Sequence, residues 1–244
     1  MTAPVGKCQI CGAYGPLSFE HVPPRAAFNC SRLLMARLDD FLKTGKPMSD
    51  FGQTARRQYQ RGAGANTLCG QCNSTTGAWY GNAYVDWVTQ GFRYLAYAKV
   101  APSLVFPFTL FPLLVIKQIA CMFLSINGED FADAHPQLVR FVLSRYERAF
   151  PSSIRIYAFY TATSTIRQSG ITATMSLDAA FEPRVTSEIV FPPFGYLLTY
   201  RSPSPDPRLM DITFFHRYSA LDLAELSLPI PVLSADSWVP GQYS

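Results

Sequence analysis

Charged side chains are scarce in this sequence: Asp, Glu, Lys and Arg make up 16% of its 244 residues, whereas 48% are hydrophobic. So little charge excludes an intrinsically disordered or fibrous chain and indicates a packed globular protein. The sequence also has no internal repeat and no low-complexity segment. Its length is sufficient for one large core or for two small ones.

The sequence has no apolar run that is long and uninterrupted enough to be a clear membrane span. The segment 100–124 is rich in Leu, Phe and Val, but Pro102, Pro107 and Pro112 divide its first half, and Lys117 follows them. A spanning helix requires about twenty apolar residues without a central charge. We therefore expect a buried extended crossing followed by a core helix, with a membrane span as the minor alternative.

An apolar stretch of signal-peptide length is also missing from the first residues, MTAPVGKCQICG. We therefore expect a protein that is not secreted, that works in the reduced cytoplasm and that has no membrane partner. In that compartment disulfides are rare, and cysteine thiolates remain available to bind zinc.

Positive charge is concentrated in the first part of the chain. Residues 1–99 hold 11 Lys and Arg against 5 Asp and Glu, a net charge of +6, and the rest holds 10 against 12, a net charge of −2. Basic side chains gain free energy by displacing counterions from phosphates, so this asymmetry favours a polyanionic partner for the first part. Ordinary surface solubility would give the same asymmetry.

The spacing of the cysteines is the strongest signal in the sequence. Four of the six form two Cys-x-x-Cys pairs separated by 57 residues, Cys8 with Cys11 and Cys69 with Cys72. Paired knuckles of this kind favour a metal over disulfides, because four thiolates match the tetrahedral coordination of structural zinc. Two coincidental pairs in a reduced core are the competing interpretation. Cys30 and Cys121 stand alone.

Helices and strands are predicted from hydrophobic spacing and from turn residues. The first 150 residues are expected to contain a strand at 17–21, stopped by Pro23, and helices at 31–43, 73–97, 113–126 and 136–149. After Pro151 the sequence is rich in Ile, Tyr, Phe and Thr, which predicts antiparallel strands at 154–163, 171–177, 185–191, 196–200 and 211–218. The segment 168–170, Gln-Ser-Gly, is expected to be a turn.

Three short motifs in the first ninety residues resemble the HNH, or ββα-metal, endonuclease superfamily. They are Cys8-Gln-Ile-Cys11-Gly, Phe19-Glu20-His21-Val22-Pro23-Pro24 and Leu68-Cys69-Gly-Gln-Cys72-Asn73. The resemblance implies a zinc-stapled treble-clef module at 1–99. The helix and strand patterns of 100–244 predict a mixed α/β domain with a mainly antiparallel sheet, so we expect an α+β protein. Because Asn73 takes the place of the usual terminal His, the chain is similar to the HNN variant.

The same resemblance implies a role for each site residue. Glu20 and Asn73 would hold a catalytic Mg²⁺ or Mn²⁺, beside a structural Zn²⁺ on the four cysteines, and His21 would be the general base that activates water. Asn66 is the nearest candidate for the middle Asn that orients this base, although it lies closer to Cys69 than the usual spacing. Glu20 stands where Asp is more common.

These roles have structural alternatives. His21 would be a hydrogen-bonded structural histidine near a zinc knuckle, and Asn73 would be a helix N-cap. Neighbouring residues on a strand point to opposite sides, so Glu20 and His21 can serve one site only at a twist or at a strand end. Pro23 and Pro24 would provide such an end.

Four arginines are candidates for phosphate contact: Arg25, Arg56, Arg57 and Arg61. They fall between the two knuckles, and Tyr59 lies among them as a side chain that could stack on a base. The competing interpretation is a solvated loop. No pattern here predicts base-specific recognition.

The predicted activity is metal-dependent hydrolysis of nucleic-acid phosphodiester bonds, with double-stranded DNA as the expected substrate. Bacterial chains that join an HNH module to an unassigned domain often serve in defence against phage or mobile DNA, so the resemblance implies such a role. One alternative is a catalytically inactive zinc module that binds nucleic acid or protein, supported by Glu20 and by the missing middle Asn. The other is a structural subunit whose zinc site staples the two halves together.

Residues 100–244 carry no motif that assigns a role. Sensing of a ligand, oligomerisation as a homodimer and docking of a partner protein would all suit this aromatic, mixed α/β sequence. Cutting both strands of DNA would require two sites and therefore a dimer. His135 and His216 lie in this half without a partner pattern and are expected to be ordinary surface or core residues.

Overall fold

The computed structural model describes residues 3–47, 50, 54, 56–98, 103–161, 166–175, 183–237 and 239–244. Helices and strands are mixed along this part of the chain, and the paired strands run antiparallel. The predicted combination of helices with mainly antiparallel sheets is therefore confirmed.

The N-terminal sheet is built from three antiparallel strands in the order β1 (Val5–Lys7), β2 (Tyr14–His21) and β5 (Gly64–Cys69). The strand predicted at 17–21 is confirmed as the second half of β2. The last strand leads without a break into the helix α2 (Gly70–Ala98), which confirms the helix predicted at 73–97. Cys69 therefore ends a strand, and Cys72 lies in the first turn of the following helix.

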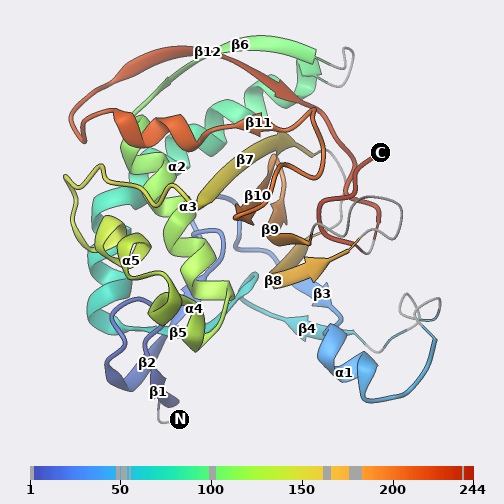
Figure 1. The fold of residues 1–244 in the computed structure, drawn as a ribbon. Coiled ribbons are helices and arrows are strands. Elements are labelled where there is room, and N and C mark those ends of the chain that lie inside the picture. The colour runs from blue at the N-terminus through green and yellow to red at the C-terminus, as the bar shows by residue number, and fades with distance from the viewer. Residues whose placement is uncertain are drawn as a thin grey trace.

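A small hairpin is inserted between β2 and β5. Its strands are β3 (Leu33–Met35) and β4 (Arg57–Tyr59), with the short helix α1 (Leu38–Leu42) after β3, and Figure 1 shows them at the lower right. The helix predicted at 31–43 is therefore wrong in its first half. Residues 33–35 pair with a strand far along the chain, and such pairing leaves no local signal in the sequence.

The segment expected to be a buried extended crossing followed by a core helix is extended and then helical, but the extended part is only half-buried, because Val105, Pro107 and Thr109 are exposed. The strand β6 (Ser103–Leu110) is followed by α3 (Pro112–Ile126), which confirms the helix predicted at 113–126. Pro112 begins this helix, where its missing N–H breaks no hydrogen bond. Every residue of α3 except Ile126 is buried. No helix in the described part of the chain is long and apolar enough to span a membrane.

Two short helices follow, α4 (Glu129–Ala134) and α5 (Pro136–Leu143). The helix predicted at 136–149 is therefore too long, because Ser144 is extended. The buried Lys117 of α3 lies at this helix end, where its ammonium group donates to the carbonyl oxygens of Phe141 and Ser144. A helix C-terminus favours a cation, although burial lowers the pKa of Lys117 to about 8.

The second half of the chain forms a five-stranded antiparallel sheet in the order β11-β7-β10-β9-β8. Its strands are β7 (Ile154–Tyr160), β8 (Arg167–Thr174), β9 (Arg184–Phe191), β10 (Phe194–Tyr200) and β11 (Met210–Asp211). They confirm the strands predicted at 154–163, 171–177, 185–191 and 196–200. The last two residues of the first prediction and the last two of the second, 162–163 and 176–177, lie outside the described part.

Two predictions for this half are wrong, and one strand was missed. The strand predicted at 211–218 ends at Asp211, whose carboxylate accepts the Thr213 N–H at 2.7 Å and starts the 3-10 helix η2 (Thr213–Arg217). Residues 168–170 are not a turn, because they lie within β8 at a register irregularity. The missed strand β12 (Ala224–Pro231) pairs with β6, and its prolines argue against a strand in the sequence.

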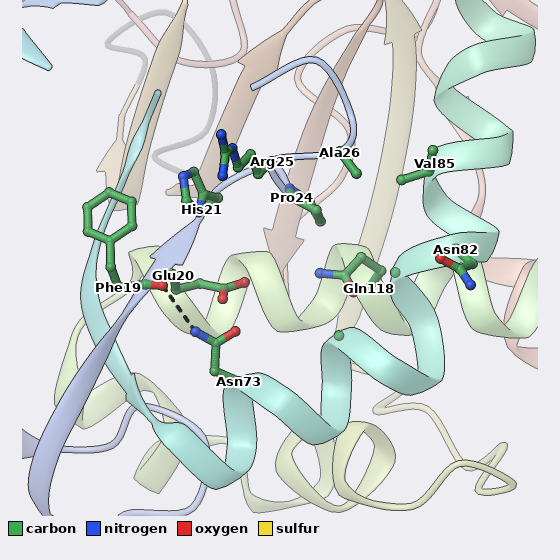
Figure 2. Close-up of a pocket in the computed structure, with 12 residues that line it drawn as sticks. Phe19, Glu20, His21, Pro24, Arg25, Ala26, Asn73, Asn82, Val85 and Gln118 are labelled. Carbon is green, nitrogen blue, oxygen red and sulfur yellow. Dashed lines mark hydrogen bonds between the residues drawn. The ribbon is translucent and has the colours of Figure 1, made fainter. Parts of the chain in front are cut away.

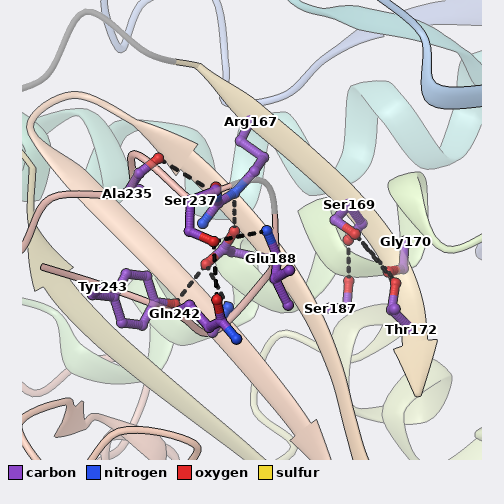
Figure 3. Close-up of polar contacts among 12 residues, drawn as sticks. Arg167, Ser169, Gly170, Thr172, Ser187, Glu188, Ala235, Ser237, Gln242 and Tyr243 are labelled. Carbon is purple, nitrogen blue, oxygen red and sulfur yellow. Dashed lines mark hydrogen bonds and ion pairs between the residues drawn. The ribbon is translucent and has the colours of Figure 1, made fainter. Parts of the chain in front are cut away.

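A buried ion pair holds the last residues of the chain against β8 and β9 (Figure 3). The fully buried Glu188 of β9 pairs with Arg167 of β8. The Tyr243 hydroxyl, at 2.5 Å, and the Gly241 N–H, at 3.3 Å, donate to the other carboxylate oxygen of Glu188. Arg167 also donates to the carbonyl oxygen of Ser237. The Glu188 carboxylate and its partner Arg167 therefore hold Ser237, Gly241 and Tyr243 against the sheet.

The two halves of the chain share one hydrophobic core. A single cluster of buried side chains includes Leu68 of the first half and Leu113 of the second, and α2 packs against α3 (Figure 1). A buried hydrogen bond of 2.6 Å joins the hydroxyls of Thr67 and Ser125 across the same contact. The predicted boundary between residues 99 and 100 lies in a segment outside the described residues. The helix α3 is consequently part of the surroundings of any site built on β2, β5 and α2.

Candidate metal centre and the polar pocket beside it

The four cysteines of the two Cys-x-x-Cys pairs come together in one cluster, as predicted. The sulfur atoms of Cys8, Cys11, Cys69 and Cys72 all lie within 4.8 Å of one another. The Cys11 and Cys69 sulfurs are 3.8 Å apart, which is about the edge of a tetrahedron with zinc–sulfur bonds of about 2.3 Å. The group could therefore hold a metal ion such as zinc.

Tight backbone turns shape this four-cysteine cluster. The N–H of Gly12 donates to the carbonyl oxygen of Cys8 at 2.9 Å, and the positive φ of 74° at Gly12 is one that glycine adopts without strain. The N–H of Cys72 donates to the Cys69 sulfur at 3.4 Å. The N–H of Gln9 donates to the Thr67 carbonyl oxygen at 2.9 Å, so the first knuckle is tied directly to the strand that carries the second.

A pocket of about 280 Å³ lies between the end of β2 and the first part of α2 (Figure 2). It borders the cluster, because Asn73, which lines it, directly follows Cys72. Its polar side chains are Glu20, His21, Arg25, Asn73, Asn82 and Gln118. The pocket thus brings together three of the four residues that were predicted to be catalytic.

Glu20 places a buried carboxylate in this pocket. Its exposed fraction is 7%, and no described residue forms a hydrogen bond or an ion pair with it. Burial raises the pKa of the Glu20 carboxyl to about 7. An isolated buried carboxylate is costly for the fold unless a cation or a donor joins it.

His21 is oriented by the backbone of Arg61. Its Nε2 lies 2.9 Å from the Arg61 carbonyl oxygen. Because a carbonyl oxygen can only accept, Nε2 carries the proton and the lone pair of the neutral ring is on Nδ1. Burial lowers the pKa of His21; the hydrogen bond to the Arg61 carbonyl opposes this shift, and the positive charges of Arg25 and Arg61 add to it. The neutral, proton-accepting form is therefore favoured.

A strand irregularity lets neighbouring residues serve one pocket. The rings of Phe19 and His21 touch edge to face at 4.8 Å on one side of β2, and Glu20 points to the other side. The pairing of β2 with β5 shifts between Ser18 and Phe19, so Thr67 has no partner there. Such bulges increase the local twist of a strand. All three residues from Phe19 to His21 line the pocket.

Asn73 presents its side-chain oxygen to the pocket. Its Nδ2 donates to the Ser18 hydroxyl at 3.0 Å and to the Phe19 carbonyl oxygen at 3.1 Å, so Oδ1 points the other way, as Figure 2 shows. The alternative of a helix N-cap is wrong, because α2 already begins at Gly70. Asn73 therefore combines a structural role through its nitrogen with an oxygen directed at the site.

Asn66 lies elsewhere, and a different asparagine fixes the pocket. Asn66 is exposed on β5 and is absent from the described residues that line the pocket. Asn29 is buried; its Nδ2 donates to the carbonyl oxygens of Pro23 and Ala63, and its Oδ1 accepts the Ala63 N–H, each at 2.7 Å. It ties the loop after His21 to the start of β5. No motif in the sequence marks Asn29, which stands between Phe28 and Cys30.

We expect replacement of Asn29 by alanine to destabilise the protein by about 3 kcal/mol, because it leaves buried backbone groups without partners. The unfolding midpoint should fall by about 6–12 °C in a thermal melt. Replacement of the exposed Asn66 by alanine is the matched control and should change stability by less than about 0.5 kcal/mol. Equal effects of the two substitutions would contradict the role given to Asn29.

The four candidate arginines separate into two groups. Arg25 lines the pocket, and both Arg25 and Arg61 act electrostatically on the His21 ring. Arg57 lies on β4 and forms an ion pair with Asp40 at 2.9 Å. Arg56 is exposed beside Arg57 and is not among the described residues that line the pocket. Arg25 and Arg61 are therefore the candidate arginines whose charges lie near the His21 ring.

Two amides of the pocket were not predicted. Asn82 lies about three turns into α2, and Gln118 comes from α3 in the second half of the chain. No motif marks either residue, and Gln118 reaches the pocket only because α3 packs against α2. Tertiary packing thus supplies part of the site.

Comparisons of the chain with protein-family models, with curated proteins and with solved structures find no match.

Proposed function

We propose that this protein is a metal-dependent nuclease that hydrolyses nucleic-acid phosphodiester bonds at an HNH-like site formed by β2, β5 and α2. The observation that carries the proposal is the convergence of Glu20, His21 and Asn73 on one pocket, one residue beyond a four-cysteine cluster. Each of the three offers the group that the chemistry needs: two oxygen ligands and a neutral imidazole.

The four-cysteine cluster fits a structural zinc ion. Four sulfur ligands leave no open coordination position, so this ion would staple the fold and take no part in hydrolysis. The cluster joins the turn before β2 to the junction of β5 and α2, and those same elements carry Glu20, His21 and Asn73. A zinc ion here would therefore fix the positions of all three.

The neighbouring pocket fits a second, oxygen-liking cation. The side-chain carboxylate of Glu20 lacks a hydrogen-bonding or ion-pairing partner among the described residues. The Oδ1 of Asn73 points into the same space. A carboxylate with an amide oxygen suits Mg²⁺ or Mn²⁺ better than zinc. When bound, such a cation supplies stabilisation of the charge that develops on the phosphate and on the leaving oxygen.

His21 and the arginines would do the remaining work. The Nδ1 of His21 accepts a proton from the attacking water, and the Arg61 carbonyl oxygen keeps its hydrogen bond to Nε2–H as the ring becomes positive. Arg25, beside His21 in Figure 2, would bind a phosphate oxygen and orient the scissile bond. The backbone of the turn before β5 would thus select which imidazole nitrogen acts.

The test is cleavage of supercoiled plasmid DNA and of end-labelled RNA by the zinc-loaded protein in Mg²⁺ or Mn²⁺. We expect nicking or cutting of at least one substrate, loss of cleavage after brief EDTA treatment and recovery on adding the divalent cation back. Zinc content is measured in each sample, so that loss of the structural ion is not mistaken for loss of the catalytic one. A folded, zinc-loaded protein that cuts neither substrate would leave a binding module as the function.

A further inference from the structure

The face of α2 that borders the pocket has glycine at two positions, Gly77 and Gly81. Asn73, Gly77, Gly81 and Val85 follow one another at intervals of four residues, and all four line the pocket. A glycine in a helix interior lowers the stability of the helix relative to alanine. Two of them at successive turns of one face therefore need a reason.

Packing within the chain does not supply that reason. A side chain added at Gly91 of the same helix would lie 2.4 Å from the Phe194 ring, so close packing explains that glycine. At Gly77 and Gly81, in contrast, an added Cβ would meet no described atom within 4 Å. The space in front of these two glycines is open and belongs to the pocket.

A buried amide without a partner lies opposite. Gln118 of α3 is only 2% exposed, and its Oε1 has no hydrogen-bond partner among the described residues. Figure 2 shows the Gln118 side chain directed across the pocket, with its amide nitrogen facing Glu20. A buried amide oxygen without a donor is unfavourable, so a ligand that brings a donor would relieve it.

We propose that this part of the pocket is a nucleotide subsite, in which the sugar–base unit next to the scissile phosphate lies against Gly77 and Gly81 while Gln118 bonds to its base. The proposal rests on the proposed nuclease function and names the part of the substrate that is held. The base lies away from its partner strand, so the substrate is single-stranded or locally unpaired nucleic acid.

Size and chemistry both favour a single nucleotide unit. The volume of about 280 Å³ is just below the range of about 300–1,000 Å³ that holds small-molecule ligands, and it is far too small for a duplex. An amide offers a donor and an acceptor side by side, which matches the edge of a nucleobase. Bare helix backbone beside Val85 would accept the flat face of the base, and unstacking a base that is already single-stranded costs least.

The test is binding of fluorescein-labelled, single-stranded pentanucleotides, measured by anisotropy in Ca²⁺. The five probes differ only at the centre, which is A, C, G, T or an abasic sugar. The wild type should bind at least one base-containing probe about tenfold more tightly than the abasic probe. Gly81→Leu, which fills the subsite, should bind all five probes like the abasic one. Gln118→Leu should lower the preference for the base about tenfold without weakening abasic binding.

Control substitutions keep these results interpretable. Ala78→Leu lies on the exposed side of the same helix, outside the pocket, and should bind like the wild type. Gly77→Ala and Gly81→Ala should raise the unfolding midpoint by about 2–4 °C, because the space is open and alanine favours the helix. If these alanine variants have a raised unfolding midpoint but bind base-containing probes more weakly, the glycines serve ligand binding and not the stability of the helix.

The outcomes separate the subsite from the nuclease activity. Equal binding of all five probes by the wild type, or unchanged binding by Gly81→Leu, would overturn the subsite, whatever the plasmid assay shows. Base-dependent binding that Gly81→Leu removes, in a wild type that cleaves nothing, would support the subsite and overturn the nuclease.

Discussion

Replacement of His21 by alanine is expected to lower the rate of phosphodiester cleavage by about 10²–10⁴-fold, the usual contribution of a positioned general base. In the proposed mechanism the loss should appear in kcat, because the Nδ1 of His21 would accept its proton only as the reaction proceeds and Arg25 would still bind the phosphate. Initial rates on the substrate that the wild type cleaves measure the effect, with zinc content checked to exclude damage to the cysteine cluster.

His216 offers a matched control for this substitution. It also forms a hydrogen bond from a ring nitrogen to a backbone carbonyl oxygen, that of Arg148 at 2.8 Å, but it does not line the pocket as described. His216→Ala should leave the cleavage rate within about twofold of the wild type, because the positioned base is untouched. A His21→Ala protein that cleaves at the wild-type rate would remove His21 from the chemistry and leave it as a structural residue beside the cluster.

Removal of one cysteine from the four-cysteine cluster is the second change with a large expected effect. Cys8→Ser removes a buried ligand, and the zinc content should fall from one ion per chain to nearly none. Structural zinc sites contribute about 10–16 kcal/mol of binding free energy in small zinc-binding peptides. Even about 4 kcal/mol of lost stabilisation would lower the unfolding midpoint by about 8–16 °C. Cleavage should be lost too, because the cluster fixes β2 and α2.

Cys30 supplies the control for the zinc experiment. It is an exposed free thiol outside the cluster, so Cys30→Ser should keep one zinc ion per chain and the wild-type midpoint. Metal analysis and thermal melts of the two serine variants measure the contrast. A Cys8→Ser protein that retains its zinc and its stability would show that the four sulfurs hold no structural ion.

Elements with a strong local pattern were predictable from the sequence, and elements that depend on distant pairing were not. Both α2 and α3 carry apolar residues at helical spacing, and both were found. The strands β3 and β12 were not, because each is defined by a partner far along the chain. The strand predicted at 211–218 ends where the Thr213 N–H donates to the Asp211 carboxylate, and hydrophobic spacing does not predict such a contact.

The site divides in the same way. The spacing of the four cysteines was enough to predict their cluster, and the motif around Glu20 and His21 was enough to predict that they share a pocket with Asn73. Their arrangement required more than the motif. The residue that braces the loop, Asn29, is recognisable only by the backbone groups that it meets, and these come from both sides of the inserted hairpin.

The packing of α3 against the N-terminal elements determines what could be transplanted into another protein. A fragment that stops near residue 99 would carry all three sequence motifs. It would nevertheless lack Gln118, leave the Thr67 hydroxyl without Ser125 and expose the apolar surface around Leu68 to water. The smallest piece worth grafting is accordingly set by where the core closes, beyond α3, because a cut near residue 99 would remove part of that core.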